Sequence, residues 1–205
     1  SSNRLPGGAL KQIGILGDRQ SLQVPAEILN RWNDLAKDVQ PQSFEIAGEK
    51  FTARIVRAAV MPQGLFAYNF RDGQNQLVIV LSDDLTSQEE RNEAIYHEFR
   101  EDYWLSTGQN DWAAHVLAAA EESIAFGQNG TKISPYHTKQ IENLTGLQRG
   151  ELIEENRERN HLVILDALGQ DKFDEYARYE NLIRAELKRI DVEVLRRDRG
   201  EEEFS

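Results

Sequence analysis

The chain has 205 residues, 40% hydrophobic and 29% charged, which is enough for a folded core of one domain or slightly more. Its net charge of -11 makes it a poor general binder of polyanionic nucleic acids. It has no cysteine, which excludes disulfides, thiolate metal sites and cysteine nucleophiles. No apolar run approaches the roughly 18 residues of a membrane span. We therefore expect a soluble, cytoplasmic protein with neither nucleic-acid nor membrane partners.

The chain begins with a stretch that is rich in Gly, Ser and Gln. Residues 1–20 are expected to form a flexible lead. Residues 25–39 follow, and their apolar side chains recur at helical spacing. Pro25 suits the first turn of such a helix. The first predicted element is therefore a helix.

Strand patterns come next. Residues 44–56 partly alternate between apolar and polar side chains around a glycine, which predicts a hairpin. Residues 64–81 predict two further strands on either side of the turn pair Asp72-Gly73. Together these patterns predict a small, mainly antiparallel sheet of three or four strands.

Two helices joined by a short loop are predicted after the sheet. Thr86, with Glu89 three residues on, resembles a capping box, so a helix is expected over 87–105. The polar stretch 106–110 interrupts it, and a second helix is expected over 111–126. A connection this short favours an antiparallel helical hairpin.

The last third is predicted to be helical. Ser134-Pro135 can start one helix, and a second capping box, Thr145 with Gln148, can start another. The segment 171–198 predicts a highly charged helix with an apolar seam at steps of three and four residues. That seam comprises Tyr176, Tyr179, Glu180, Ile183, Leu187, Ile190 and Val194.

The predicted organisation is an α+β fold in which a small sheet packs on the helical hairpin, followed by a helical C-terminal region. The boundaries that we predict are an α+β domain over 21–130, a helical region over 131–200 and a frayed acidic tail over 201–205.

One face of the first hairpin helix carries residues that can bind metal. His97 and Glu101 are four residues apart and therefore lie on the same face, as does Glu93. Glu98 is rotated by about 100° from His97. The helix is apolar around His97, and a buried histidine beside a glutamate needs partners.

The second helix offers a matching face, with His115 and Glu122. If the hairpin closes on these faces, His97, Glu101, His115 and Glu122 converge. Two imidazoles with one or two carboxylates suit Zn²⁺, and equally Fe²⁺ or Mn²⁺. We expect a divalent metal, with zinc favoured, held by His97, Glu101 and His115. Glu98 is then placed to take a proton from a metal-bound water.

Two other interpretations of these residues remain open. The acidic side chains can be a solvated helix face, or the histidines and glutamates can form a purely structural buried network. His137 and His161 are expected at the surface. His137 is an outlying ligand only if the chain folds back.

The apolar strand, polar turn, capped helix and His-Glu pair resemble the layout of minimal zincin metallopeptidases, especially those of the ImmA/IrrE type. The resemblance covers about residues 44–126. It implies that His97 is the first metal ligand and Glu98 the general base. Glu101 stands where these enzymes have their second histidine, so the motif is H-E-x-x-E. The resemblance also implies a third ligand from the next helix, either His115 or Glu122.

Three functions follow from these observations. The first is a metal-dependent hydrolase, specifically a zincin-like peptidase that acts on a protein or peptide. The second is a non-catalytic, zincin-like interaction or regulatory module whose charged C-terminal helices bind a protein partner or form an oligomer. The third, a ferritin-like di-metal oxidase, fits less well, because it needs paired Glu-x-x-His motifs on a four-helix bundle.

Overall fold

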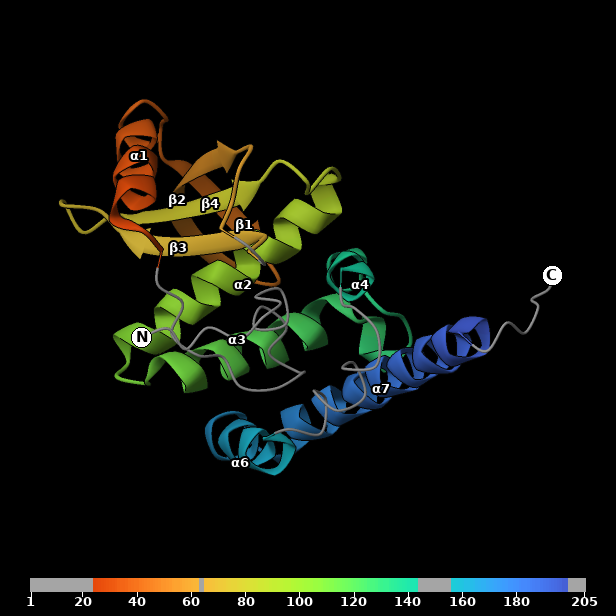
Figure 1. Cartoon of the computed structure of the whole chain (residues 1–205). Helices are drawn as coiled ribbons and strands as arrows, with labels where there is room; N and C mark the ends of the chain where they lie inside the picture. The colour runs from red at the N-terminus through yellow and green to blue at the C-terminus, as the bar shows by residue number, and fades with distance from the viewer. Residues whose placement is uncertain (1–23, 63–64, 144–155, 199–205) are drawn as a thin grey trace.

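The computed structural model describes residues 24–62, 65–143 and 156–198, with side chains described as far as residue 190. The fold is α+β, as predicted, with a four-stranded sheet at one end and helices at the other (Figure 1). The helices and strands, in chain order, are α1 (Ala26–Lys37), β1 (Gln42–Ile46), β2 (Glu49–Ala58), β3 (Ala67–Arg71), β4 (Leu77–Ser82), α2 (Gln88–Ser106), α3 (Asp111–Phe126), the 3-10 turn η3 (Gln128–Gly130), α4 (Pro135–Glu142), α6 (Arg157–Leu168) and α7 (Gln170–Asp198).

The sheet has the strand order β1-β2-β4-β3. The two predicted hairpins are confirmed, because β1 pairs with β2 and β3 with β4, both antiparallel. The central pair, β2 with β4, is parallel, so the sheet is mixed. Strand β3 follows β2 in the chain but takes the edge of the sheet, which leaves β4 beside β2. The sequence prediction missed this pair because the crossover has no local signal.

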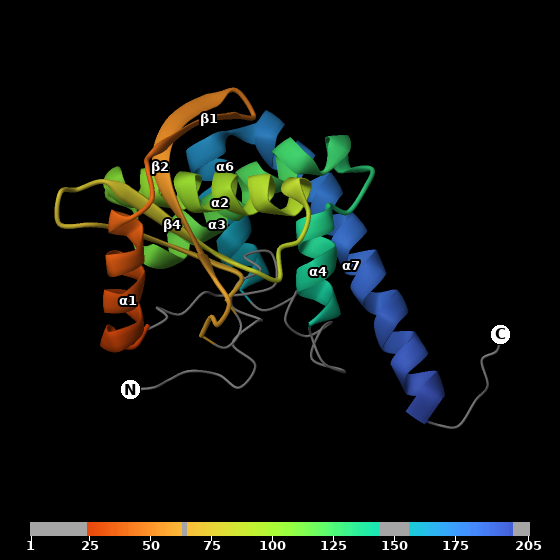
Figure 2. The same ribbon diagram turned by 90° about the horizontal axis from the view of Figure 1, so that it is seen from above.

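Strand β4 is covered on both sides, as its continuous apolar sequence predicts. Val78 and Val80 face α1, where Trp32 is buried among them. The alternate residues of the strand face α2 instead. Figure 2 shows α1 and α2 lying on opposite sides of the strands. The sheet therefore holds α2 firmly from one side.

The helical hairpin is confirmed, but its first cap lies one residue later than predicted. Ser87, not Thr86, caps α2: its Oγ accepts from the Glu90 amide at 3.0 Å, and the Glu90 carboxylate accepts from the Ser87 amide at 3.1 Å. The Glu90 carboxylate also accepts from the Thr86 amide at 2.9 Å. With Ser87 as the cap, the backbone amides of both Thr86 and Ser87 therefore have an acceptor. Asn110 caps α3.

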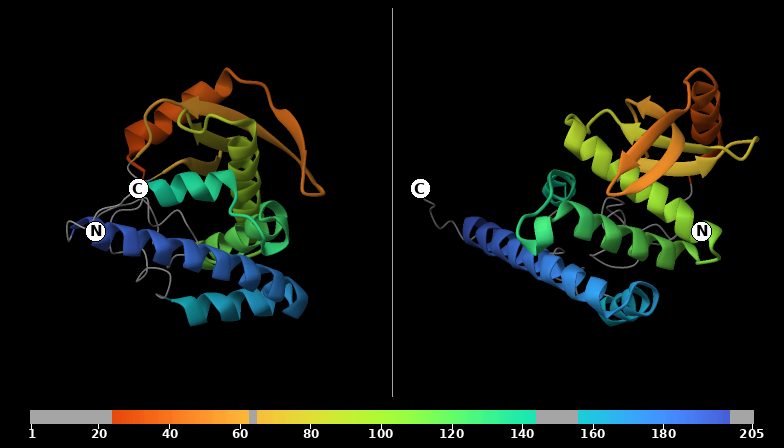
Figure 3. Two further views of the ribbon diagram at one scale, coloured as in Figure 1. Left: turned by 90° about the vertical axis from the view of Figure 1, so that its right-hand side faces the viewer. Right: turned by 180° about the vertical axis from the view of Figure 1, so that it is seen from behind.

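The predicted apolar seam of the last helix is buried within the chain. Tyr176, Tyr179, Ile183 and Leu187 of α7 pack with α3 and α6 in one core, and Ile190 lies against it. Figure 3 shows α3 between the sheet side of the molecule and the α6–α7 pair. The division of the chain near residue 130 and an oligomer through these helices remain predictions.

Some predictions fall outside the described residues: the N-terminal lead, the Thr145–Gln148 capping box, the acidic tail and the side chain of Val194. Within the described ranges, no helix combines the length and the apolar character that crossing a membrane requires.

The chain leaves α3 through a glycine that lies against α7. A Cβ atom on Gly127 would lie 2.3 Å from the Tyr179 ring. We therefore expect Gly127→Ala to lower the free energy of unfolding by about 1–3 kcal/mol, as overpacking does. Gly73→Ala is the matched control, because a Cβ there meets nothing within 4 Å. Urea denaturation of both variants checks this, and equal midpoints would contradict the close packing.

Candidate metal centre

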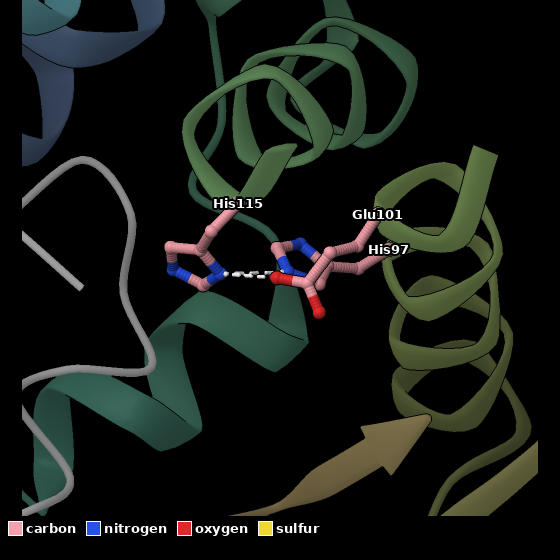
Figure 4. Close-up of side chains that lie close together, drawn as sticks. All are labelled: His97, Glu101 and His115. Atoms are coloured by element: carbon pink, nitrogen blue, oxygen red, sulfur yellow. Dashed lines mark hydrogen bonds and ion pairs between the residues drawn. The ribbon is translucent and has the colours of Figure 1, made fainter. Parts of the chain in front are cut away.

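The hairpin brings His97, Glu101 and His115 together. His97 and Glu101 project from α2 and His115 from α3, and their side chains meet between the two helices (Figure 4). His115 Nδ1 lies 3.3 Å from His97 Nε2 and 3.0 Å from Glu101 Oε2. Zinc bonds of about 2.0–2.1 Å in a tetrahedron place ligand atoms roughly 3.3 Å apart. These two separations therefore match those of metal ligands, and all three ligand atoms lie within 4.8 Å of one another.

The same three side chains are removed from water, with exposed fractions of 4% for His97, 2% for Glu101 and 2% for His115. Helix α3 allows this because alanines make up much of its buried face, so that α2 can approach closely. Buried ionisable groups are stable only when they are paired, hydrogen-bonded or bound to metal. The cluster therefore needs a proton or a cation to hold it together.

Glu98 is tied to the cluster by a side chain from the sheet. Asn69 of β3 donates through Nδ2 to Glu98 Oε1 and to Glu101 Oε1, both at 2.8 Å. Glu98 is itself buried. Asn69 is not among the predicted site residues, and its only signal in the sequence is a polar residue inside the apolar stretch Phe66–Phe70. A candidate base and a candidate ligand thus share one orienting amide.

A second group of three lies beside the first: Glu93 of α2, Glu122 of α3 and His137 of α4. His137 Nε2 is 3.1 Å from Glu122 Oε2, and His137 Nδ1 is 3.8 Å from Glu93 Oε2. The surface placement predicted for His137 is wrong, because the chain folds back after α3 and buries this histidine. The position of His137 agrees better with the alternative, in which the chain folds back and His137 is an outlying ligand.

Glu122 connects the two groups. Its Oε1 lies 2.7 Å from His97 Nδ1, while its Oε2 faces His137. It was predicted to join His97, Glu101 and His115, but it belongs to the second group and contacts the first only through His97. A carboxylate on the outer nitrogen of a metal-binding histidine fixes the ring and raises its basicity.

Burial dominates the electrostatics of the second group. It raises the pKa of Glu122 to about 7, an effect that a hydrogen bond with Glu93 partly opposes. Burial, followed by the charge of Glu122, raises the pKa of Glu93 well above its usual range. Burial also lowers the pKa of His137. The metal-free cluster is therefore one in which carboxyl groups retain protons near neutral pH.

The fourth histidine lies apart from this cluster. His161 of α6 is partly buried rather than fully at the surface, and its Nε2 is 2.8 Å from Glu180 Oε1 of α7. Tyr176 donates to the other oxygen of Glu180 at 3.1 Å. The His161–Glu180 contact joins α6 to α7, so His161 is a suitable control for variants of the other three histidines.

Comparison with known proteins finds no matching family model, no matching curated protein and no matching solved structure. The fold and the site therefore define a class only: an α+β protein with buried His/Glu groups that could hold a metal ion.

Proposed function

We propose that the chain is a metal-dependent hydrolase of the peptidase type, in which His97, Glu101 and His115 hold a divalent metal. The observation that carries this proposal is the spacing of the three ligand atoms, with Glu98 oriented beside them. Two imidazoles and one carboxylate are a donor set that Zn²⁺ accepts in catalytic sites, as do Fe²⁺ and Mn²⁺. Glu101 therefore replaces the second histidine of the zincin motif without removing a ligand.

A divalent metal in such a site polarises a carbonyl group and lowers the pKa of water. The protein's own contribution is proton transfer and positioning. Glu98 accepts the proton of the attacking water and passes it to the leaving amine. Asn69 holds the Glu98 and Glu101 carboxylates in a fixed relation, since its amide donates to both.

Substrate access is proposed from the side of β3. This strand is an edge of the described sheet, and Asn69 lies on it, only partly buried. An extended peptide can add to a free strand edge through backbone hydrogen bonds. A peptide bound there would run past Asn69, whose side chain contacts both Glu98 and Glu101.

A specific observation favours a second candidate, a non-catalytic interaction or regulatory module. All of His97, Glu98, Glu101 and His115 are nearly inaccessible to solvent, as expected where a metal only fastens two helices together. In that function the metal stabilises the hairpin, and a protein partner binds elsewhere on the surface.

One experiment separates the two candidates. Untagged protein is analysed for Zn, Mn and Fe and then incubated with an unstructured peptide library, whose products are read by mass spectrometry. We expect bound metal and cleavage that a chelator stops and that added metal restores. Bound metal without any cleavage would favour the module, and protein that neither contains metal nor binds it would refute the hydrolase and leave a purely structural His/Glu network.

A further inference from the structure

In the second group of side chains, two buried carboxylate oxygens, Glu93 Oε1 and Glu122 Oε2, accept no hydrogen bond from an N–H or O–H group outside the group. Their neighbours lie within the group itself, because Glu122 Oε2 is 3.1 Å from His137 Nε2 and the two carboxyl groups interact with each other. Both residues are almost fully buried, with exposed fractions of 0% and 1%. An unsatisfied buried polar group costs about 1–3 kcal/mol, and more when it is charged. Two such atoms in one cluster are satisfied either by a proton that the carboxyl groups share or by a cation bound between them.

Each residue of this group is held by its outer polar atom. Ser134 Oγ donates to Glu93 Oε2 at 2.7 Å, and His97 Nδ1 lies 2.7 Å from Glu122 Oε1. The Tyr179 hydroxyl lies 2.7 Å from His137 Nδ1. In each residue the protein engages one polar atom and leaves the other for the shared centre. Partners that fix ligands from outside in this way are typical of metal sites.

From this pattern we infer that Glu93, Glu122 and His137 form a second metal position, which makes the cluster a two-metal centre. The inference adds a site to the proposed function and rests on the same buried cluster. It draws ligands from three helices, α2, α3 and α4, so metal there would also fasten α4 to the hairpin.

Charge supports a dication at this position. In the described part of the chain, the ion pairs of Glu93 and Glu122 are with histidines and none is with Lys or Arg. The nearby cations are engaged elsewhere, because Arg100 binds Glu121 and Lys139 binds Glu90. Two ionised carboxylates with a neutral imidazole are balanced by one divalent ion. Metal binding would therefore displace the protons that the metal-free carboxyls retain.

The two positions differ in their donor atoms. The first offers two imidazole nitrogens and one carboxylate, whereas the second offers one imidazole and two carboxylates. Carboxylate-rich sites suit harder ions such as Mn²⁺, while imidazole suits Zn²⁺. We expect the second position to take Mn²⁺ or Fe²⁺ more readily than the first does.

The test is the number of metal ions that the untagged, full-length chain binds. Metal-stripped protein is titrated calorimetrically with Zn²⁺ alone and with Mn²⁺ alone, and bound metal is counted by elemental analysis. We expect about two equivalents for the wild type and about one for both His137→Ala and His115→Ala. His161→Ala, the matched control, should keep both.

A gentler variant keeps the test decisive if His137→Ala fails to fold. Tyr179→Phe retains the ring and removes only the hydroxyl that contacts His137 Nδ1. It should weaken binding of the second equivalent roughly 10–100-fold, as loss of an outer partner does, and leave the first unchanged. An unchanged second equivalent in folded Tyr179→Phe would contradict the inference.

The remaining outcomes distinguish this inference from the proposed function. One equivalent in the wild type that persists in His137→Ala would overturn the second position and leave the first intact. One equivalent that persists in His115→Ala but is lost in His137→Ala would refute the first position, and with it the proposed function and the two-metal centre, and would leave the second group as the metal site. No binding to the wild type would refute both metal positions.

Discussion

Glu98→Gln is expected to lower the rate of peptide hydrolysis about 10²–10⁴-fold while the metal content stays unchanged, because general-base catalysis has this magnitude. Glutamine has the same shape and its carbonyl oxygen can still accept from Asn69, so the contact at 2.8 Å is preserved. What the variant loses is the ability to take up a proton. The effect should fall on kcat, with KM little changed.

Three measurements on the same preparations make this prediction specific: kcat, KM and metal content. Glu121→Gln is the matched control, because Glu121 is also a largely buried glutamate on the hairpin but binds Arg100 and Trp104 instead of the cluster. Circular dichroism first shows whether Glu121→Gln is folded. The folded variant should have the kcat of the wild type. Unchanged kcat in Glu98→Gln would rule out Glu98 as the base. Loss of metal in that variant would make it a ligand instead.

The features that were predicted correctly depend on local geometry. Residues four apart on a helix share a face, and a short loop returns the next helix antiparallel. Those two rules suffice to bring His97 and Glu101 to His115. The two β-hairpins were predicted for the same reason, since a turn and its flanking strands are close in sequence. The parallel pairing of β2 with β4 depends on a crossover and could not be predicted this way.

The residues that were missed lie where distant segments meet. Asn69 reaches Glu98 from the sheet, and His137 reaches Glu93 and Glu122 from α4. Helix α4 is only eight residues long. A sequence pattern that short does not show which face of the helix is buried, or which element it packs against. Glu93 was correctly placed on the His97 face, but its partners come from α3 and α4. The positions of these partners follow from the packing of α3 and α4 against α2. The spacing of residues along the sequence does not determine that packing.

His97→Ala is expected to abolish most of the stability that metal gives the protein. His97 lies against both groups, with Nε2 toward His115 and Nδ1 on Glu122. The substitution removes a ligand from the first position and the outer partner of a ligand from the second. Both metals should therefore bind much more weakly.

The size of the effect follows from mass action. A ligand at about 1,000 times its Kd stabilises a folded protein by roughly 4 kcal/mol. In a chain of this length, that shifts Tm by about 8–16 °C. The readout is the difference in Tm between metal-loaded and metal-stripped protein, so any loss of packing in His97→Ala itself cancels. Wild type and the control His161→Ala should show the full shift, and His97→Ala little or none. A full shift in His97→Ala would place the metal outside this cluster.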